Sequence, residues 1–174
     1  MSKYLLFAIS LLMSFSSTAM EVTNYRLGVG DEIEILVYDE PDLTVQITIN
    51  DNGNINFPLI GTISVLGNTA TQVQRLIHNG LKKGYLLNPS VQVDIVTYRP
   101  FYIHGEVNKP GAYSYQPGLN VDQAIALAGG LSERASVSKI YIKQSHHKNK
   151  KGNKVNLSYA VSPGDIITID QSFF

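Results

Sequence analysis

The sequence predicts an α+β protein made of short strands with few helices. Apolar and polar residues alternate over short runs, as in Ile33, Ile35 and Val37, and this two-residue period indicates half-buried strands. Only two windows carry the spacing of an amphipathic helix. Hydrophobic residues make up 44% of the 174 residues and charged residues 16%, which is typical of a globular chain. This length suits one ordinary domain or two small ones.

The first half predicts a small unit of short strands plus one helix. Strands are expected at residues 33–37, 45–50, 54–58, 62–66 and 91–95. The sequence Asp-Asn-Gly at 51–53 predicts a hairpin turn between the second and third of these strands. Thr69 and Gln72 have the spacing of a capping box, and Val73, Ile77 and Leu81 recur on one helical face. A helix is therefore predicted from Thr69 to a stop at Gly84.

The second half predicts a β-grasp-like unit. Residues 101–107 and 112–115 are expected to form strands around a turn at 109–111. Asn120 can cap a short helix that ends at Gly129-Gly130, and further strands are expected near 140–142, 155–157 and 167–169. Strand, turn, strand, helix and further strands is the order of a β-grasp. The whole chain is therefore assigned to the α+β class.

The first residues have the pattern of a signal peptide. Lys3 precedes an apolar run at 4–13, and the small residues Ser17 and Ala19 suit a cleavage site. We expect residues 1–19 to be a signal peptide cleaved after Ala19, and an uncleaved membrane anchor is the alternative. The two units then occupy residues 20–99 and 100–174, outside the cytoplasm.

Composition excludes several function classes. Lys and Arg total 14, as do Asp and Glu, so no strong field is present to attract nucleic acid. The chain has no cysteine, which excludes disulfides, a thiolate zinc site and a thiol nucleophile. We predict no nucleic-acid partner and no cofactor.

No catalytic or metal-binding constellation is predicted. Asp39, Glu40 and Asp42 lie together, but a strand-end turn explains them better than a pair of glycosidase carboxylates. His104 has no partner at ligand spacing. The basic run at 146–154 is interpreted as a solvated hairpin tip, with contact to an anionic glycan as the alternative.

Two sets of residues are candidates for structural or binding roles. Gly-Asp precedes an apolar strand at both 30–31 and 164–165, which indicates a turn closed by the Asp side chain. The turn and cap set is Gly30, Asp31, Pro58, Gly61, Gly105, Pro110, Gly111, Gly129, Gly130, Gly164 and Asp165. The tyrosine set, as possible sugar contacts, is Tyr98, Tyr102, Tyr113 and Tyr115. Sheet packing is the simpler explanation of these tyrosines.

Several segments, in this order, resemble a known family. They are residues 25–35 (YRLGVGDEIEI), 40–43 (EPDL), 51–61 (DNGNINFPLIG), 88–93 (NPSVQV), 105–113 (GEVNKPGAY), 126–131 (ALAGGL) and 163–167 (PGDII). The pattern is similar to the polysaccharide biosynthesis/export proteins, also called outer-membrane polysaccharide exporters. By this resemblance, residues 20–99 are the export domain and residues 100–174 a soluble-ligand-binding β-grasp (SLBB) domain.

The resemblance implies a function without catalysis. Such proteins are periplasmic, associate with the outer membrane, and form a homo-oligomeric ring that conducts capsule, exopolysaccharide or biofilm polysaccharide. An inner-membrane polysaccharide copolymerase is the implied partner. Because the sequence carries neither the family's lipid-bearing cysteine nor its C-terminal membrane helix, it resembles the short form, and a separate outer-membrane protein is expected. The alternatives are a soluble periplasmic glycan- or small-ligand-binding protein and, further off, a carbohydrate-active enzyme using Asp39 or Asp42.

Overall fold

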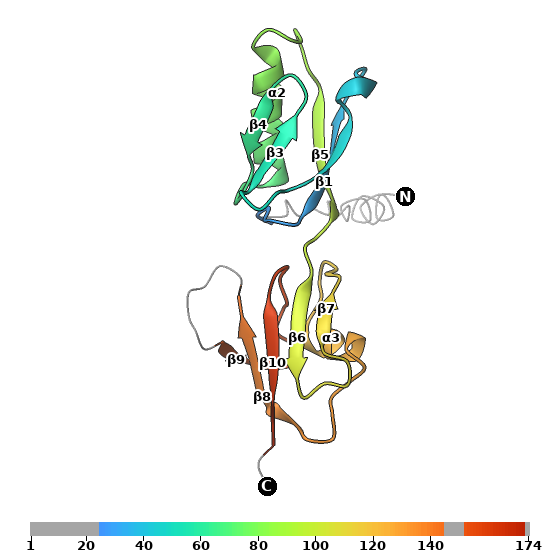
Figure 1. Cartoon of the computed structure of the whole chain (residues 1–174), viewed down its shortest axis with the longest axis vertical. Helices are drawn as coiled ribbons and strands as arrows, with labels where there is room; N and C mark the ends of the chain where they lie inside the picture. Colours follow the sequence, from blue (N-terminus) through green and yellow to red (C-terminus); the bar gives the residue numbers. More distant parts are fainter. Residues whose placement is uncertain (1–24, 145–151, 173–174) are drawn as a thin grey trace, which may run out of the picture.

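The protein consists of two modules placed end to end along its longest axis (Figure 1). The computed structural model describes residues 25–144 and 152–172. The predicted signal peptide, most of the basic run and the final two residues lie outside this part of the chain. The polypeptide passes once from the first module to the second, between strand β5 (Val91–Thr97) and strand β6 (Phe101–Gly105).

The first module is organised around strand β1 (Glu32–Val37). This strand lies between β2 (Val45–Thr48) and β5, and it is antiparallel to both. A single 3-10 turn, η1 (Pro41–Leu43), links β1 to β2. Strands β3 (Asn54–Phe57) and β4 (Gly61–Ser64) form a separate two-stranded sheet. Alternating apolar residues of β1 and β5 point into the core.

Helix α2 (Ala70–Lys82) packs against β5. Its N-terminus has the predicted capping box: Thr69 accepts from the Gln72 backbone, and the Gln72 side chain accepts from the Thr69 backbone. Val73, Ile77 and Leu81 are buried on one face, as their spacing predicts. The helix therefore covers one face of the β2-β1-β5 sheet.

The predicted hairpin between residues 45–50 and 54–58 is wrong, although the turn itself forms. The Asn50 side chain accepts hydrogen bonds from the backbones of Asn52 and Asn54, at 3.1 and 2.9 Å. However, β2 pairs with β1, and β3 pairs with β4. The Gly53 carbonyl accepts hydrogen bonds from Val65 and Leu66, which directs the chain into the second sheet. Local turn residues predicted the bend but could not determine the strand pairing.

The second module is a β-grasp. Its sheet has the order β7-β6-β10-β8-β9, in which β10 (Ile166–Gln171) lies parallel to β6 and antiparallel to β8 (Ala135–Lys143). Strands β7 (Gly111–Tyr113) and β9 (Asn153–Val155) form the edges. Helix α3 (Val121–Leu127) begins after the Asn120 cap and covers one face of the sheet. The α+β class and the β-grasp-like unit predicted from the sequence are confirmed.

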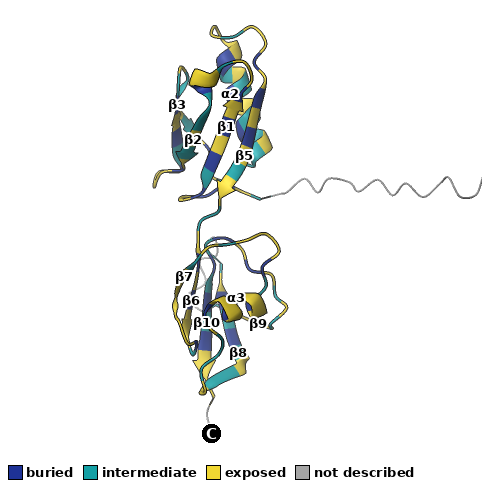
Figure 2. Cartoon of the chain, turned by 90° about the vertical axis from the view of Figure 1, so that its right-hand side faces the viewer, coloured by how far each residue is buried: buried dark blue, intermediate teal, exposed yellow. Residues whose placement is uncertain are grey.

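Each module has its own hydrophobic core (Figure 2). Leu27, Ile33, Ile55 and Ile77 belong to the first core, which joins both small sheets to α2. Phe101, Ile103, Ile140 and Ile167 belong to the second, which lies between the β-grasp sheet and α3. Since no buried residue is shared, the short segment between β5 and β6 is where the two modules are coupled.

Candidate functional site

Residues 98–100, between β5 and β6, are called the linking segment. Asp31 is the centre of a polar cluster where the first module meets this segment. Its side chain is fully buried at the start of β1. One carboxylate oxygen accepts from the Gly28 backbone at 2.7 Å and from the Tyr25 hydroxyl at 2.6 Å. The other accepts from the backbone N–H of Arg99 at 2.8 Å. The carboxylate therefore ties the chain before β1 to the chain after β5.

Arg99 completes this cluster with its side chain. Its Nη1 lies 2.9 Å from Asp31 Oδ2 and donates to the Tyr25 hydroxyl at 2.7 Å. The guanidinium also lies 5.7 Å from the centre of the Tyr25 ring, within cation–π distance. Only 11% of the Arg99 side chain is exposed. A charge pair this buried must be well satisfied by hydrogen bonds, and these contacts satisfy it.

Gly28 leaves the space that the Arg99 side chain occupies. A Cβ atom at Gly28 would lie 2.1 Å from Arg99 Nη1 and 2.6 Å from Cζ. Any other residue at this position would displace the guanidinium. A side chain at Gly28 would therefore disturb the contacts that the guanidinium makes with Asp31 and Tyr25.

A row of three tyrosine rings extends from this cluster to the second module. Tyr25 meets Tyr98 edge to face with ring centres 5.0 Å apart, and Tyr98 meets Tyr115 in the same way at 5.3 Å. Tyr25 precedes the first sheet, Tyr98 lies in the linking segment, and Tyr115 follows β7. Edge-to-face pairs add specific geometry to burial. The row gives the two modules a direct side-chain contact.

The surroundings raise the pKa values of these tyrosines. Burial, and next the hydrogen bond to Asp31, raise the pKa of Tyr25 far above its ordinary value. Burial, followed by the charge of Asp31, also raises the pKa of Tyr98. Burial is the main cause of a raised pKa at Tyr115 as well. The hydroxyls therefore stay protonated, and that of Tyr25 remains the donor that Asp31 needs.

Asp165 repeats the turn geometry of Asp31 in the second module. Asp31 accepts from the backbone three residues earlier, and Asp165 accepts from the Ser162 backbone at 2.8 Å in the same way. Gly30 and Gly164 precede them with φ of 85° and 84°. The Asp165 carbonyl accepts from Tyr102, and the Gly164 backbone donates to Pro100. This second turn therefore holds the other end of the linking segment.

The other members of the turn and cap set lie apart from this junction. Pro58 and Gly61 form the bend between β3 and β4, Pro110 and Gly111 precede or begin β7, and Gly129 and Gly130 end α3. Gly105, at the end of β6, has a φ of 91°, and a Cβ there would lie 2.1 Å from the Ile169 carbonyl oxygen. These positions shape the modules, and only the two Gly-Asp turns meet at the linking segment.

The tyrosine set divides in the structure. Tyr98 and Tyr115 are in contact, whereas Tyr113 stacks on Phe101 at 5.9 Å and donates to the Lys109 carbonyl at 2.6 Å. Tyr102 is 46% exposed on the face of the β-grasp sheet opposite α3. On the same face, His104 Nε2 lies 3.1 Å from the Thr168 hydroxyl. Tyr102 is therefore placed to meet a solute.

The acidic residues near Pro41 lie on an exposed turn. Asp39 has a φ of 62° and, like Asp42, is exposed on the turn around η1. Within residues 25–144 and 152–172, no three His, Cys, Asp or Glu residues are grouped so that they could hold a metal ion. No helix in this part of the chain has the length and apolar character needed to cross a membrane.

Sequence reasoning missed two essential members of the junction, Tyr25 and Arg99. Tyr25 enters the sequence prediction only within the motif at 25–35, and Arg99 only as the last residue of the first unit. They are 74 residues apart, so no local spacing relates them. The available signal was Arg99 itself, a charged residue directly before proline at a module boundary.

The fold and this junction define a class of protein: a small sheet-and-helix module joined through a buried polar cluster to a β-grasp. Comparison with known proteins agrees with this class. The sequence model of the polysaccharide biosynthesis/export proteins matches residues 19–96, and that of the SLBB domain matches residues 100–154.

Curated relatives cover both modules. The exopolysaccharide production protein ExoF of Rhizobium meliloti (strain 1021) is 31% identical over 132 residues, which span 69% of this chain and 31% of ExoF. The EPS I polysaccharide export outer membrane protein EpsA of Ralstonia nicotianae is 30% identical over 64% of this chain and 36% of its own length. The polysialic acid transport protein KpsD of Escherichia coli is 27% identical over 77% of this chain and 24% of KpsD.

The chain belongs to the polysaccharide biosynthesis/export protein family. It spans between about a quarter and about a third of the length of the curated relatives that it matches.

Proposed function

We propose that this protein is a non-enzymatic component of a machine that exports capsule, exopolysaccharide or biofilm polysaccharide. The observation that carries the proposal is the match of both family models, in the order export domain then SLBB domain. We assign these domains to residues 20–99 and 100–174. The names of ExoF, EpsA and KpsD refer to production, export or transport of such polymers, which supports the same role here.

In this proposal the protein works in the periplasm, in association with the outer membrane, after loss of residues 1–19. Copies assemble into a ring that encloses a passage for the polymer. The inner-membrane copolymerase lies on one side, and a separate outer-membrane protein continues the route on the other. The coupled modules support this assembly, because a repeating subunit must hold its two halves at one angle for contacts to close into a ring.

The experiment is deletion of the gene in its host with measurement of polymer in the medium and in the periplasm. The proposal expects loss of extracellular polymer, recovered by the wild-type gene. Normal secretion by the deletion strain would contradict the export role. Recovery of polymer by a protein that lacks residues 1–19 and stays in the cytoplasm would contradict the location.

A second candidate function is binding of a soluble glycan or other small ligand by the β-grasp module. The observation in its favour is the open sheet face that carries exposed Tyr102 and the His104–Thr168 pair, next to a shallow hollow lined by Tyr141, Gly152, Thr168 and Asp170. Aromatic faces and hydroxyl partners suit sugar rings. Titration with oligosaccharides, using wild-type protein and Tyr102→Ala, distinguishes the two. A saturable site on a stable monomer would favour this candidate.

A further inference from the structure

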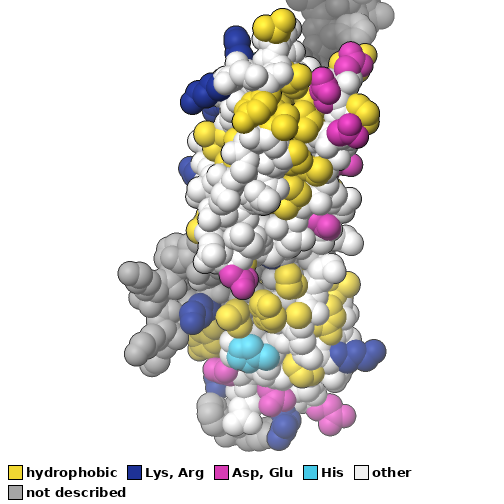
Figure 3. Space-filling model, turned by 45° about the horizontal axis from the view of Figure 1, so that its top comes forward, with side chains coloured by type: hydrophobic (Ala, Val, Ile, Leu, Met, Phe, Trp, Pro, Cys, Tyr) yellow, Lys and Arg dark blue, Asp and Glu magenta, His cyan; other side chains and the backbone are white. Residues whose placement is uncertain are grey.

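The first module carries opposite charges on its two flanks. Residues 32–48 and 91–97, which contain the β2-β1-β5 sheet and η1, include six Asp and Glu and no Lys or Arg. Residues 70–83, which contain α2 and its C-cap, include three Lys and Arg and no Asp or Glu. Figure 3 shows basic side chains along one flank of this module and acidic side chains along the opposite flank.

The acidic flank is an open sheet face with features of a contact surface. We call it the acidic face and define it by Glu34, Leu36, Asp94 and Val96, four exposed residues of β1 and β5 on the side away from α2, which share this face with Gln92. Leu36 and Val96 are 41% and 47% exposed, so apolar surface lies among the carboxylates. In the β1–β5 register the Glu34–Asp94 pair lies between Leu36 and Val96, so the face has a charged centre with apolar contact surface on either side.

Two carboxylates of this face oppose each other directly. Glu34 and Asp94 are cross-strand partners in the β1–β5 register. Like charges placed opposite each other weaken a sheet. The Gln92 side chain donates to Asp94 at 2.7 Å, but this neutral group does not cancel the charge of Asp94. A basic partner surface would turn this unfavourable pair into a favourable one.

The opposite flank provides such a surface. We call it the basic face and define it by Arg75, Leu76, Lys82 and Lys83, which are exposed along α2 and its C-cap. Leu76 is an exposed apolar residue among the three cations, as Leu36 and Val96 are among the carboxylates. The two faces therefore carry charges of opposite sign, and both include exposed apolar side chains.

We propose that the acidic face of one copy binds the basic face of α2 in the next copy. This inference rests on the proposed ring and identifies the surfaces that form it. Because the faces lie on opposite sides of the sheet, the contact is head-to-tail and each copy keeps one face of each kind available. Repetition of such a contact produces a ring when the rotation closes.

Two charge-reversed variants of the full chain test this contact. The acid-reversed variant is Glu34→Lys with Asp94→Lys, and the base-reversed variant is Lys82→Glu with Lys83→Glu. Each is expected to associate roughly a hundredfold more weakly than wild type, because like charges then face each other across the contact. Light scattering of the purified proteins measures their size.

Mixing the two variants gives the decisive measurement. The acid-reversed copy has two basic faces and the base-reversed copy has two acidic faces, so only an alternating assembly restores attraction. The proposal expects each variant alone to be monomeric and the equimolar mixture to form assemblies again. A mixture that stays monomeric would overturn it.

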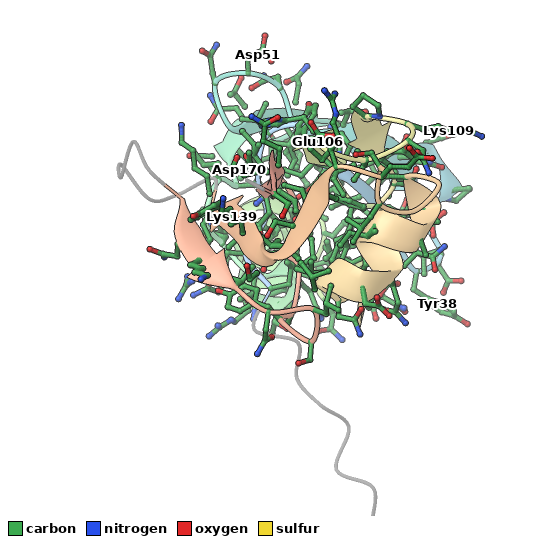
Figure 4. All side chains as sticks on the ribbon, turned by 90° about the horizontal axis from the view of Figure 1, so that it is seen from below. Tyr38, Asp51, Glu106, Lys109, Lys139 and Asp170 are labelled. Atoms are coloured by element: carbon green, nitrogen blue, oxygen red, sulfur yellow. The ribbon has the colours of Figure 1, made fainter. Side chains whose placement is uncertain are left out.

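Matched controls change the same number of charges elsewhere. Asp51→Lys with Asp170→Lys and Lys109→Glu with Lys143→Glu alter exposed residues outside both faces. Asp51 lies on the side of the molecule opposite Tyr38, and Lys109 and Asp170 belong to the second module (Figure 4). These controls are expected to assemble like wild type. Equal losses in the controls and the reversed variants would mean that net charge alone is responsible, which contradicts the contact.

Two further outcomes separate this contact from the proposed ring. Wild-type protein that assembles, together with reversed variants that assemble equally well, would overturn the contact and leave the ring intact. Wild-type protein that is monomeric at every concentration and salt level would contradict both. Circular dichroism of each variant checks folding. The wild-type association must also weaken with salt, since these charges are exposed, and salt-independent assembly would contradict the contact even if a variant failed to fold.

Discussion

Replacement of Arg99 by methionine is expected to destabilise the first module by about 3 kcal/mol, since breaking one side of a buried ion pair leaves a charge without its partner. Methionine retains much of the side-chain volume but cannot donate a hydrogen bond to Asp31 or to Tyr25. The magnitude lies at the low end for buried pairs because Asp31 keeps three donors: the Tyr25 hydroxyl and the backbones of Gly28 and Arg99.

Urea unfolding followed by far-ultraviolet circular dichroism measures the total loss of stability. Hydrogen exchange then locates it, and faster exchange is expected in β1 and β5 than in β8 and β10, because the two cores share no buried residue. Arg26→Met is the matched control. Arg26 is exposed and makes one hydrogen bond, to the Gly67 carbonyl, so its loss should cost below about 0.5 kcal/mol.

A double-mutant cycle with Asp31→Asn shows whether the pair itself is responsible. The double variant should be more stable than the sum of the single losses predicts, because the second change removes the charge that the first left unpaired. An Arg99→Met variant as stable as the control, or single effects that simply add, would refute the account of the junction.

Three other perturbations test the close contacts and the buried tyrosines. Gly28→Ala should lower the free energy of unfolding in urea by about 2 kcal/mol, because the new Cβ displaces the Arg99 guanidinium. Gly111→Ala is the control and should be nearly neutral, and equal effects of the two variants would contradict the close contact at Gly28. Gly105→Ala should cost about 3 kcal/mol, because its Cβ meets the Ile169 carbonyl oxygen at a positive φ, and hydrogen exchange should become faster in β6 and β10 but stay unchanged in β1. The pKa of Tyr98 is raised in the folded state, so the unfolded state loses this proton at lower pH, and the free energy of unfolding should be constant below about pH 10 and fall as the pH rises further. Tyr98→Phe should make this fall smaller in urea unfolding measured at several pH values. The same dependence of stability on pH in the variant and the wild type would contradict the burial of Tyr98.

Local patterns predicted most of the elements of this fold. The capping residues and apolar spacing of α2 act within one or two turns of helix, so residues 69–84 contain the necessary information. The same is true of the alternating runs that became β1, β5 and β10. The order of elements in the second half was sufficient for the β-grasp, because few sheet topologies fit two strands, a helix and three more strands.

Strand pairing and the junction required information that a local pattern does not carry. The turn at Asn50 predicts a bend in either arrangement, and only the tertiary contacts of Gly53 separate β3 from β2. Asp31 was recognised as a turn residue because its bond to Gly28 spans three positions. Its ion pair with Arg99 spans 68 positions, and one sequence contains no pattern at that range. The roles proposed for the turn and cap set and for Tyr102 stay predictions.

The buried carboxylate of Asp31 has a mechanical consequence for the linking segment. Because the Asp31 side chain binds both the backbone and the side chain of Arg99, that residue has no freedom to swivel, and bending between the halves is confined to the few bonds around Pro100. A closed circle of subunits adds up the angular error of every member. In the proposed ring, a stiff pivot in each copy would therefore keep that error small and fix the diameter of the opening.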